Sequence, residues 1–249
     1  VDAFYRAIGF KLLEGYGITE AGPVLSVRDC IKPRSNCVGI VYPSAQIKIV
    51  REKNGAVLSR EPLGFGKKGL VFARGDQIMK GYYKRDDLTR TVIDDGLWLN
   101  TGDLGILSFD NEIKIIGRAK DAIVLLGGEN VEPSAVEKAL CMSRFIETAY
   151  VTGQDQKHLG ALIVPDREAV CDFALRRGLL YCDYADLLHQ PDVHALIRAE
   201  IDKTVNADTG FRPCELIHRF CLLPDSFSVG RELSAKQEFM RYKIDKIYA

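Results

Sequence analysis

The sequence predicts a mixed α/β and α+β fold that is divided into two unlike regions. Over residues 37–118, short β-type runs alternate with turn signals built from Gly, Pro and Asp. After about residue 120, strand-like runs alternate with longer helical stretches. The 249 residues are 47% hydrophobic, which is enough to fill one large core or two ordinary ones.

The first region is expected to begin with a helix and to continue as strands. Phe4, Ala7 and Ile8 have helical spacing. Four later runs alternate apolar and polar residues between turn signals, which is typical of strands. These runs are QIKIV (46–50), GLVFARG (69–75), LWLNTGD (97–103) and NEIKIIGR (111–118).

The second region is expected to contain both helices and strands. Pro133 stands where a first helical turn tolerates proline, and Val136 and Leu140 follow at i, i+4 spacing. A second helix is expected after the turn signal at 190–192, because apolar residues recur there at helical spacing. They are Val193, Leu196, Ile197 and Ile201. Strands are expected in TAYVTGQ (148–154), ALIVPD (161–166) and HRFCLLP (218–224).

Composition argues against several classes of protein. The 34 Lys and Arg residues balance 34 Asp and Glu residues, and no basic run is interleaved with aromatic residues, so a nucleic-acid partner is not expected. No apolar run approaches the roughly 20 residues that span a bilayer, and the first ten residues lack the features of a signal peptide. We expect a soluble, cytoplasmic protein.

The seven cysteines are an odd number, and they form no C-x-x-C pair. They fit a reducing compartment better than a disulfide framework or a metal site. We expect them to serve as small buried hydrophobic residues.

Three clusters of residues carry chemistry, and the first is LEGYGITEAGP at 13–23. Thr19 and Glu20 offer a hydroxyl donor and a hard oxygen ligand, which could meet a phosphate and its magnesium ion. Tyr16 adds a flat surface, while Gly15 and Gly17 permit positive φ and close backbone approach. The alternative interpretation is a helix-to-strand turn with a solvated glutamate.

The second cluster is WLNTGDLG at 98–105, where Asp103 could accept hydrogen bonds from the vicinal hydroxyls of a ribose. Its alternative is an ordinary Gly-Asp turn. The third cluster places Arg118 and Lys120 after a strand, followed by Gly127, Gly128 and Glu129 in an expected tight turn. Arg118 could bind phosphate or sugar oxygens, and the alternative is a β-hairpin with a basic, solvated edge.

Taken together, these motifs resemble those of the adenylate-forming superfamily, which includes acyl-CoA synthetases, adenylation domains and luciferases. The resemblance is carried by YGITE (16–20), TGDLG (101–105), GRAKDAIVLLGGENVEP (117–133) and GLVFARGDQIMKGYYKRDDLT (69–89). It extends over the whole chain. The tail from about 166 to 231, together with ELIHRFCLLPDSFSVGRELS, most resembles long-chain fatty acid CoA ligases.

The resemblance implies a nucleotide site for ATP and AMP. Tyr16 would stack on adenine, with Gly15 and Gly17 shaping the floor of the site. Thr19 would contact the α-phosphate, and Glu20 would hold Mg²⁺.

The resemblance also assigns the residues further along the chain. Asp103 would bind the ribose hydroxyls, assisted by Arg118 at the end of the large domain. Lys120 would be the hinge about which a small domain reorients. The loop formed by Gly127, Gly128 and Glu129 would line the tunnel for the pantetheine arm of coenzyme A.

The implied organisation is the C-terminal part of a large AMP-binding domain at 1–118 and a small mobile C-terminal domain at 119–249. The implied reaction has two steps. A fatty acid carboxylate attacks the α-phosphorus of ATP to give acyl-adenylate and pyrophosphate, and the thiol of CoA then displaces AMP. Peripheral membrane association would suit such a substrate.

Two departures from the family pattern are present. The glycine- and hydroxyl-rich phosphate loop does not precede YGITE in this sequence. We therefore expect a fragment that lacks the N-terminal part of the large domain and is inactive by itself. The second departure is that Glu238 stands where the family has its catalytic lysine, while Leu233 and Arg241 match the flanking pattern. Lys236 could substitute, since residues i and i+2 of an extended segment point to the same side.

Two alternatives remain open at this stage. The chain could come from a noncatalytic relative that binds a nucleotide or a partner. It could also come from a ligase that transfers the acyl group to a carrier protein instead of CoA, because both acceptors present the same pantetheine arm.

Overall fold

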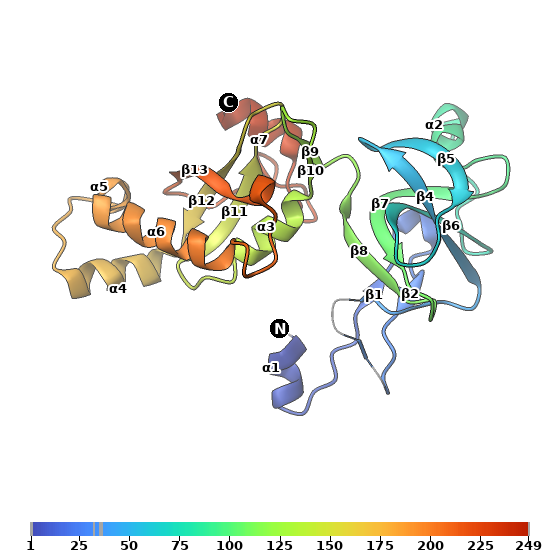
Figure 1. The fold of residues 1–249 in the computed structure, drawn as a ribbon, viewed down its shortest axis with the longest axis horizontal. Coiled ribbons are helices and arrows are strands. Elements are labelled where there is room, and N and C mark those ends of the chain that lie inside the picture. Colours follow the sequence, from blue (N-terminus) through green and yellow to red (C-terminus); the bar gives the residue numbers. More distant parts are fainter. Residues whose placement is uncertain (1, 32, 35–36, 249) are drawn as a thin grey trace. The chain divides into compact units, whose positions relative to one another are not determined.

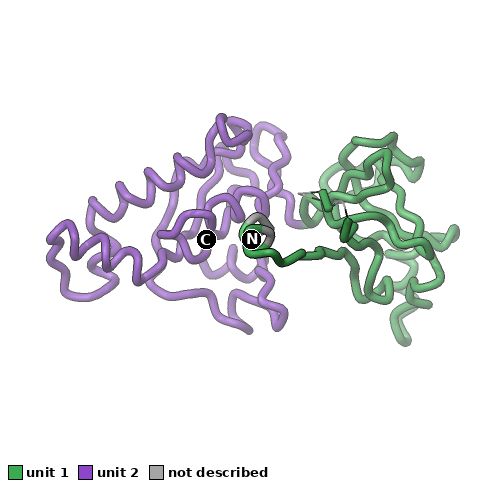
Figure 2. Tube along the Cα trace, turned by 90° about the horizontal axis from the view of Figure 1, so that it is seen from below, with its two compact units in different colours: residues 1–120 green, residues 121–249 purple. Residues whose placement is uncertain are grey.

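The computed structural model describes residues 2–31, 33–34 and 37–248. Its contacts divide the chain into two compact units, residues 1–120 and residues 121–249 (Figure 2). Both units combine β-sheet with helices, and the expected mixed α/β and α+β character is confirmed (Figure 1).

The main sheet of the first unit has five antiparallel strands in the order β5-β4-β6-β7-β8. These are β4 (Ala45–Lys53), β5 (Ala56–Pro62), β6 (Lys68–Gly75), β7 (Leu99–Leu107) and β8 (Ile113–Arg118). Helix α2 (Asp86–Val92) lies between β6 and β7 in the sequence. The four runs that were expected to be strands lie in β4, β6, β7 and β8.

Local sequence explains two features of this sheet. The β4–β5 hairpin turns on Asn54 and Gly55, both at positive φ (52° and 77°), as a two-residue type I′ turn requires. In the central strand β6, Leu70, Val71 and Phe72 are all buried, because core packs against both faces of the sheet. Because both of its faces are buried, β6 lacks the alternation of apolar and polar residues that is seen in a strand with one solvated face.

A smaller sheet carries the YGITE motif. It pairs β1 (Gly15–Tyr16) with β2 (Ser26–Val27) and β2 with β3 (Ile40–Val41), all antiparallel. Helix α1 (Asp2–Ala7) precedes this sheet, and the 3₁₀ turn η1 (Thr19–Ala21) lies between β1 and β2. Ala21 and Leu25 pack with Ala73 and Leu99 of the main sheet in one core cluster. This packing holds the motif beside strands β6 and β7.

The second unit is built on a three-stranded sheet in the order β11-β12-β13. Strands β11 (Ile146–Thr152) and β12 (Leu159–Pro165) are antiparallel, whereas β12 and β13 (Ile217–Leu222) are parallel. The parallel pair needs a long connection. This connection contains α4 (Arg167–Arg177), α5 (Tyr184–His189), α6 (Pro191–Thr204) and the turn η2 (Pro213–Glu215).

The helices of the second unit begin and end at the residues that local chemistry favours. Helix α3 (Pro133–Leu140) and helix α6 both place proline in the first turn. The Asp166 carboxylate caps α4 by accepting from the Ala169 N–H at 2.8 Å, and Gly178 ends that helix at φ 67°. Val193, Ile197 and Ile201 of α6 are buried against the sheet, and the helix predicted from their spacing is confirmed.

Two buried carboxylates hold the C-terminal segment, which ends in α7 (Arg241–Tyr248), on the second unit. Arg241 Nη2 donates to both oxygens of Glu137, at 2.7 and 2.8 Å, and its Nη1 donates to the Val151 carbonyl at 3.1 Å. Glu232 accepts from the N–H and the hydroxyl of Ser228, both at 3.0 Å, and from the Tyr248 hydroxyl at 3.2 Å. Both carboxylates are thus fully engaged.

The cysteines do not behave as expected. All seven are free thiols among the described residues, four of them exposed and three half-buried. The expectation of buried, core-filling cysteines was wrong for the four exposed ones, such as Cys221 of β13, whereas the half-buried Cys171 and Cys214 pack against the core of the second unit. Within the described part of the chain, no helix is both long enough and apolar enough to cross a membrane.

Replacing Arg241 by Met is expected to destabilise the second unit by about 3 kcal/mol. The substitution leaves the Glu137 carboxylate buried without its cation. Chemical denaturation, monitored through a spectroscopic probe in the second unit, measures the loss of unfolding free energy. Lys246→Met, at an exposed position of the same helix, is the matched control. Equal stability of the two variants would show that the buried pair contributes nothing.

Tyr184 makes the stability of the second unit depend on pH in the alkaline range. Burial, followed by the nearby Cys171, raises the pKa of Tyr184 to about 12. A raised folded-state pKa contributes stability below pH 10, the ordinary value for tyrosine, and this contribution is lost as the pH rises through 12.

Tyr184→Phe should therefore flatten the fall in unfolding free energy between pH 10 and 12. Each titrating group contributes a slope of at most about 1.4 kcal/mol per pH unit, and less where water reaches a half-buried ring. Urea unfolding at several pH values measures the slope. Tyr83→Phe, at a ring that is 86% exposed, is the control. Identical slopes for both variants would contradict the assignment.

Candidate functional site

The YGITE motif depends on close packing of the backbone. A Cβ atom on Gly17 would lie 1.4 Å from the Pro23 carbonyl oxygen, and one on Gly15 would lie 3.2 Å from the Ser26 carbonyl oxygen. The expectation of positive φ at these two glycines was wrong, since that conformation occurs at Gly22, which ends η1 at φ 60°. Gly17 is required and Gly15 is favoured because the chain folds tightly against its own next segment.

Tyr16, Asp103 and Arg118 meet at one point of the first unit. The Tyr16 hydroxyl donates to Asp103 Oδ2 at 2.6 Å, and Arg118 Nε lies 3.1 Å from Asp103 Oδ1. Asp103 and Arg118 are direct partners across strands β7 and β8. The register of β7 and β8 and the packing of the small sheet beside the main sheet therefore bring together three residues that the sequence had singled out separately.

The Asp103 carboxylate is held in a polar but largely buried setting. Asp103 is 5% exposed, and its backbone N–H donates to the Thr101 hydroxyl at 3.2 Å. That hydroxyl in turn donates to the Val71 carbonyl at 2.9 Å. Burial, followed by the charge of Asp103, raises the pKa of Tyr16 far above its ordinary value. Tyr16 therefore remains a neutral donor and Asp103 an acceptor whose orientation is fixed.

Thr19 and Glu20 lie in η1, where Thr19 is exposed and Glu20 is half-buried. Glu20 Oε1 accepts a hydrogen bond from the Tyr82 hydroxyl at 2.9 Å. Tyr82 belongs to the KGYY stretch, to which the sequence analysis gave no role. The GYY motif was visible in the sequence, but only the folded chain shows that its first tyrosine, Tyr82, contacts Glu20.

Glu20 is the residue in this region that could hold a metal ion. Among the described residues, no group of three or more His, Cys, Asp and Glu side chains could form an all-protein metal site. A single half-buried carboxylate suits Mg²⁺, which retains several waters and is bound by one or two carboxylates together with phosphates. The residues present therefore fit a magnesium ion that arrives with a nucleotide.

The predicted loop residues of the second unit form a hairpin tip. Gly127, Gly128 and Glu129 connect β9 (Ile123–Val124) to β10 (Asn130–Val131), and all three are exposed. Gly128 has φ 86°, and its N–H donates to the Leu125 carbonyl at 2.8 Å. Lys120 is exposed and is the last residue of the first unit.

Lys236 and Glu238 do not lie on an extended segment, so the prediction that an extended backbone points both side chains to the same side was wrong. Ser234 N–H donates to the Glu238 carbonyl at 2.8 Å, and Gln237, at φ 60°, donates to the Ser234 carbonyl at 2.9 Å. Residues 234–238 therefore form a tight turn with Lys236 at its tip. The reason is the bridge between Leu233 and Phe239, which brings the two ends of the turn together.

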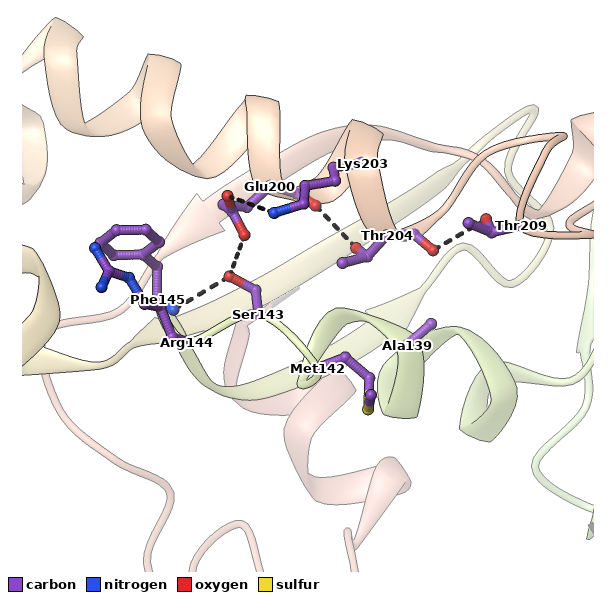
Figure 3. A pocket seen from close by; sticks show the side chains of 9 residues that line it. All are labelled: Ala139, Met142, Ser143, Arg144, Phe145, Glu200, Lys203, Thr204 and Thr209. Carbon is purple, nitrogen blue, oxygen red and sulfur yellow. Dashed lines mark hydrogen bonds and ion pairs between the residues drawn. The ribbon is translucent and has the colours of Figure 1, made fainter. Parts of the chain in front are cut away.

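A pocket of about 540 Å³ lies in the second unit, between the end of α3 and the last turns of α6 (Figure 3). Its polar groups already pair with one another, since the Ser143 hydroxyl donates to Glu200 Oε2 at 2.7 Å and Lys203 Nζ lies 3.7 Å from Glu200 Oε1. No residue that the sequence analysis selected lines this pocket.

Comparison with protein families gives two matches along the chain. The family described as AMP-binding enzyme matches residues 1–83, and the domain described as AMP-binding enzyme C-terminal domain matches residues 120–175.

Curated relatives match over most of the chain. A probable acyl-activating enzyme 16 of Arabidopsis thaliana chloroplasts is 44% identical over 68% of this chain and 24% of that protein. A chloroplastic long-chain-fatty-acid–[acyl-carrier-protein] ligase of the same plant is 40% identical over 68% of this chain and 24% of that protein. Its peroxisomal long chain acyl-CoA synthetase 7 is 30% identical over 94% of this chain and 33% of that protein. The chain thus spans about a quarter to a third of the length of these relatives.

Among solved structures, the A domain of carboxylic acid reductase from Segniliparus rugosus has a TM-score of 0.78 and 25% identity. The match covers 99% of this chain and 35% of that chain. That structure is described as a complex with AMP and a co-purified carboxylic acid.

Proposed function

Because this chain belongs to the AMP-binding enzyme family, we propose that it recognises the nucleotide in a ligase that activates fatty acids as acyl-adenylates. The observation that carries this proposal is the buried Asp103 carboxylate held between Tyr16 and Arg118. A carboxylate in this setting can accept hydrogen bonds from the two vicinal hydroxyls of a ribose. The Tyr16 ring offers an aromatic face for adenine.

The phosphates of the nucleotide would be met by η1. Thr19 supplies an exposed hydroxyl for the α-phosphate, and the Glu20 carboxylate would hold Mg²⁺. When bound, Mg²⁺ neutralises the charge that develops on the phosphates. The residues of this chain contribute orientation, because Tyr16, Asp103 and Glu20 are all fixed by hydrogen bonds before a ligand arrives.

We assign the two units to the two domains of such an enzyme. The first unit would be the C-terminal part of the large AMP-binding domain, and the second would be the small mobile domain with Lys120 at the hinge. The hairpin loop of Gly127, Gly128 and Glu129 would line the path of a pantetheine arm. Its exposure and the glycine conformation at 128 suit a loop that lies against a ligand.

The acyl acceptor is proposed to be coenzyme A, and the acid a long-chain fatty acid. The relatives named as long-chain acyl-CoA synthetases support this choice. A carrier protein is the alternative acceptor, and it is favoured by the relative named as an acyl-carrier-protein ligase. Peripheral association of the protein with a membrane would suit a long-chain fatty acid substrate.

A noncatalytic nucleotide-binding protein is the second candidate. Glu238 stands where the family has its catalytic lysine, and its negative charge would repel a phosphate. Lys236, two residues earlier, lies at the tip of an exposed turn that is anchored at its base. We propose that Lys236 provides the missing positive charge, and its removal separates the two candidates.

Asp103→Asn is expected to weaken AMP binding by about 10- to 100-fold. The ribose hydroxyls lose a charged acceptor, and hydrogen bonds to charged groups contribute about 1.5 to 3 kcal/mol. A nuclear magnetic resonance titration with AMP measures dissociation constants even in the millimolar range. Asp76→Asn, at an exposed aspartate of the same unit, is the control. Unchanged AMP affinity in Asp103→Asn would remove this residue from the site.

Lys236→Ala is expected to slow the adenylation half-reaction by about 10²- to 10³-fold, as is typical of losing one preorganised charge-stabilising group. Thioester formation from preformed acyl-adenylate should be spared. Pyrophosphate release and thioester formation are measured separately in the protein that contains this chain. Lys236→Arg, which keeps the charge, is the matched control. No effect on either half-reaction, or an equal loss in both, would leave the noncatalytic candidate standing.

A further inference from the structure

We infer that Tyr82 is a positioning residue for Glu20, and that Thr89 of helix α2 holds Tyr82 in place. This inference rests on the proposed function, because it gives Glu20 the role of carrying a divalent cation bound to a nucleotide's phosphates. It adds two residues, Tyr82 and Thr89, from a part of the chain that the nucleotide site otherwise does not use.

Three contacts join the segment around Glu20 to the segment around Tyr82. The Met79 N–H donates to the Glu20 carbonyl at 2.8 Å, and the Tyr82 hydroxyl donates to Glu20 Oε1 at 2.9 Å. A Cβ atom on Gly22 would lie 2.8 Å from the Gln77 carbonyl oxygen, so the two backbones touch. Both the main chain and the side chain of Glu20 are therefore held by residues 77–82.

Tyr82 is itself held by α2. Its backbone N–H donates to the Thr89 hydroxyl at 2.9 Å, and that hydroxyl donates to the Arg85 carbonyl at 3.0 Å. A Cβ atom on Gly81 would lie 2.9 Å from Thr89, so only glycine lets the chain pass this close to the helix. These contacts fix the backbone of Tyr82 while leaving its hydroxyl directed at Glu20.

The physical need for such support follows from where Glu20 lies. It is half-buried in a turn of three residues, so its own element does little to fix its rotamer. A free glutamate side chain loses rotamer entropy when it binds a metal ion, and a hydrogen bond made beforehand reduces that loss. The Tyr82 hydroxyl already makes such a hydrogen bond to Glu20 before a ligand arrives.

The test compares the ATP affinity of the protein that contains this chain with and without Mg²⁺. In the wild type, Mg²⁺ should strengthen ATP binding, and Glu20→Gln should abolish most of that gain. Tyr82→Phe should reduce the gain by roughly five- to tenfold, the size expected for one hydrogen bond to a charged group acting indirectly. AMP affinity without Mg²⁺ should stay unchanged in Tyr82→Phe, which also shows that the variant is folded. Tyr83→Phe, next in sequence and 86% exposed, is the matched control.

Thr89 is tested in the same way. Thr89→Val removes the hydroxyl that accepts from Tyr82 and should reduce the Mg²⁺ gain in the same direction. Thr89→Ser keeps the hydroxyl and should restore it. A readout that needs no nucleotide is the Tyr82 ring in a protein with isotope-labelled tyrosine. Its resonance should shift in Glu20→Gln, because the hydroxyl loses its charged acceptor.

The outcomes separate this inference from the proposed function. If the wild type shows no ATP or AMP binding, or if Asp103→Asn binds AMP as well as the wild type does, both are overturned. If Asp103→Asn weakens AMP binding and Glu20→Gln removes the Mg²⁺ gain while Tyr82→Phe keeps it in full, the inference alone is overturned. A purely structural role for Tyr82 would lower AMP and Mg²⁺-dependent ATP affinity together, and that result would also overturn it.

Discussion

A buried carboxylate needs partners, and the first unit is organised around one of them. Asp103 is 5% exposed, so its charge must be met by donors within the protein. Tyr16 and Arg118 meet it from strands β1 and β8, while Asp103 itself lies on β7. This requirement ties the small sheet to the large one. It thereby places YGITE beside TGD, which is where we propose that a nucleotide binds.

The second unit also contains buried carboxylates that are met by donors from the protein. Glu137 is buried in α3 and is met by Arg241 and by the Val151 N–H, so a residue near the C-terminus is tied to the first helix of the unit. Glu232 and Ser228 hold the segment that enters the turn of residues 234–238. The exposed Lys236 is therefore presented on a turn whose base is anchored by buried, paired charges. Here the paired carboxylates support stability and placement, whereas Asp103 is proposed to bind a ribose.

Hydroxyl groups of tyrosine recur at the positions that orient carboxylates. Tyr16 donates to Asp103, Tyr82 donates to Glu20, and Tyr150 donates to Asp245 at 2.7 Å. A phenol is a suitable partner because it donates one directional hydrogen bond without adding a charge. In each case burial and the neighbouring carboxylate raise the pKa of the tyrosine, so the donor persists over the pH range in which the carboxylate is ionised. The carboxylate is thus oriented without losing its negative charge.

The sequence by itself determined the local elements and the motifs of this protein. Alternation and turn signals located β4, β6, β7 and β8, and the spacing of Val193, Ile197 and Ile201 located α6, because periodicity and turn chemistry act over a few residues. Only the tertiary structure decided which distant residues meet. The contact between Tyr16 and Asp103 spans 87 residues and depends on the packing of the small sheet beside the main sheet, and the turn around Lys236 depends on the pairing of Leu233 with Phe239. The exposure of the cysteines was likewise decided by tertiary packing, since a residue's type does not state which face of its element the core covers.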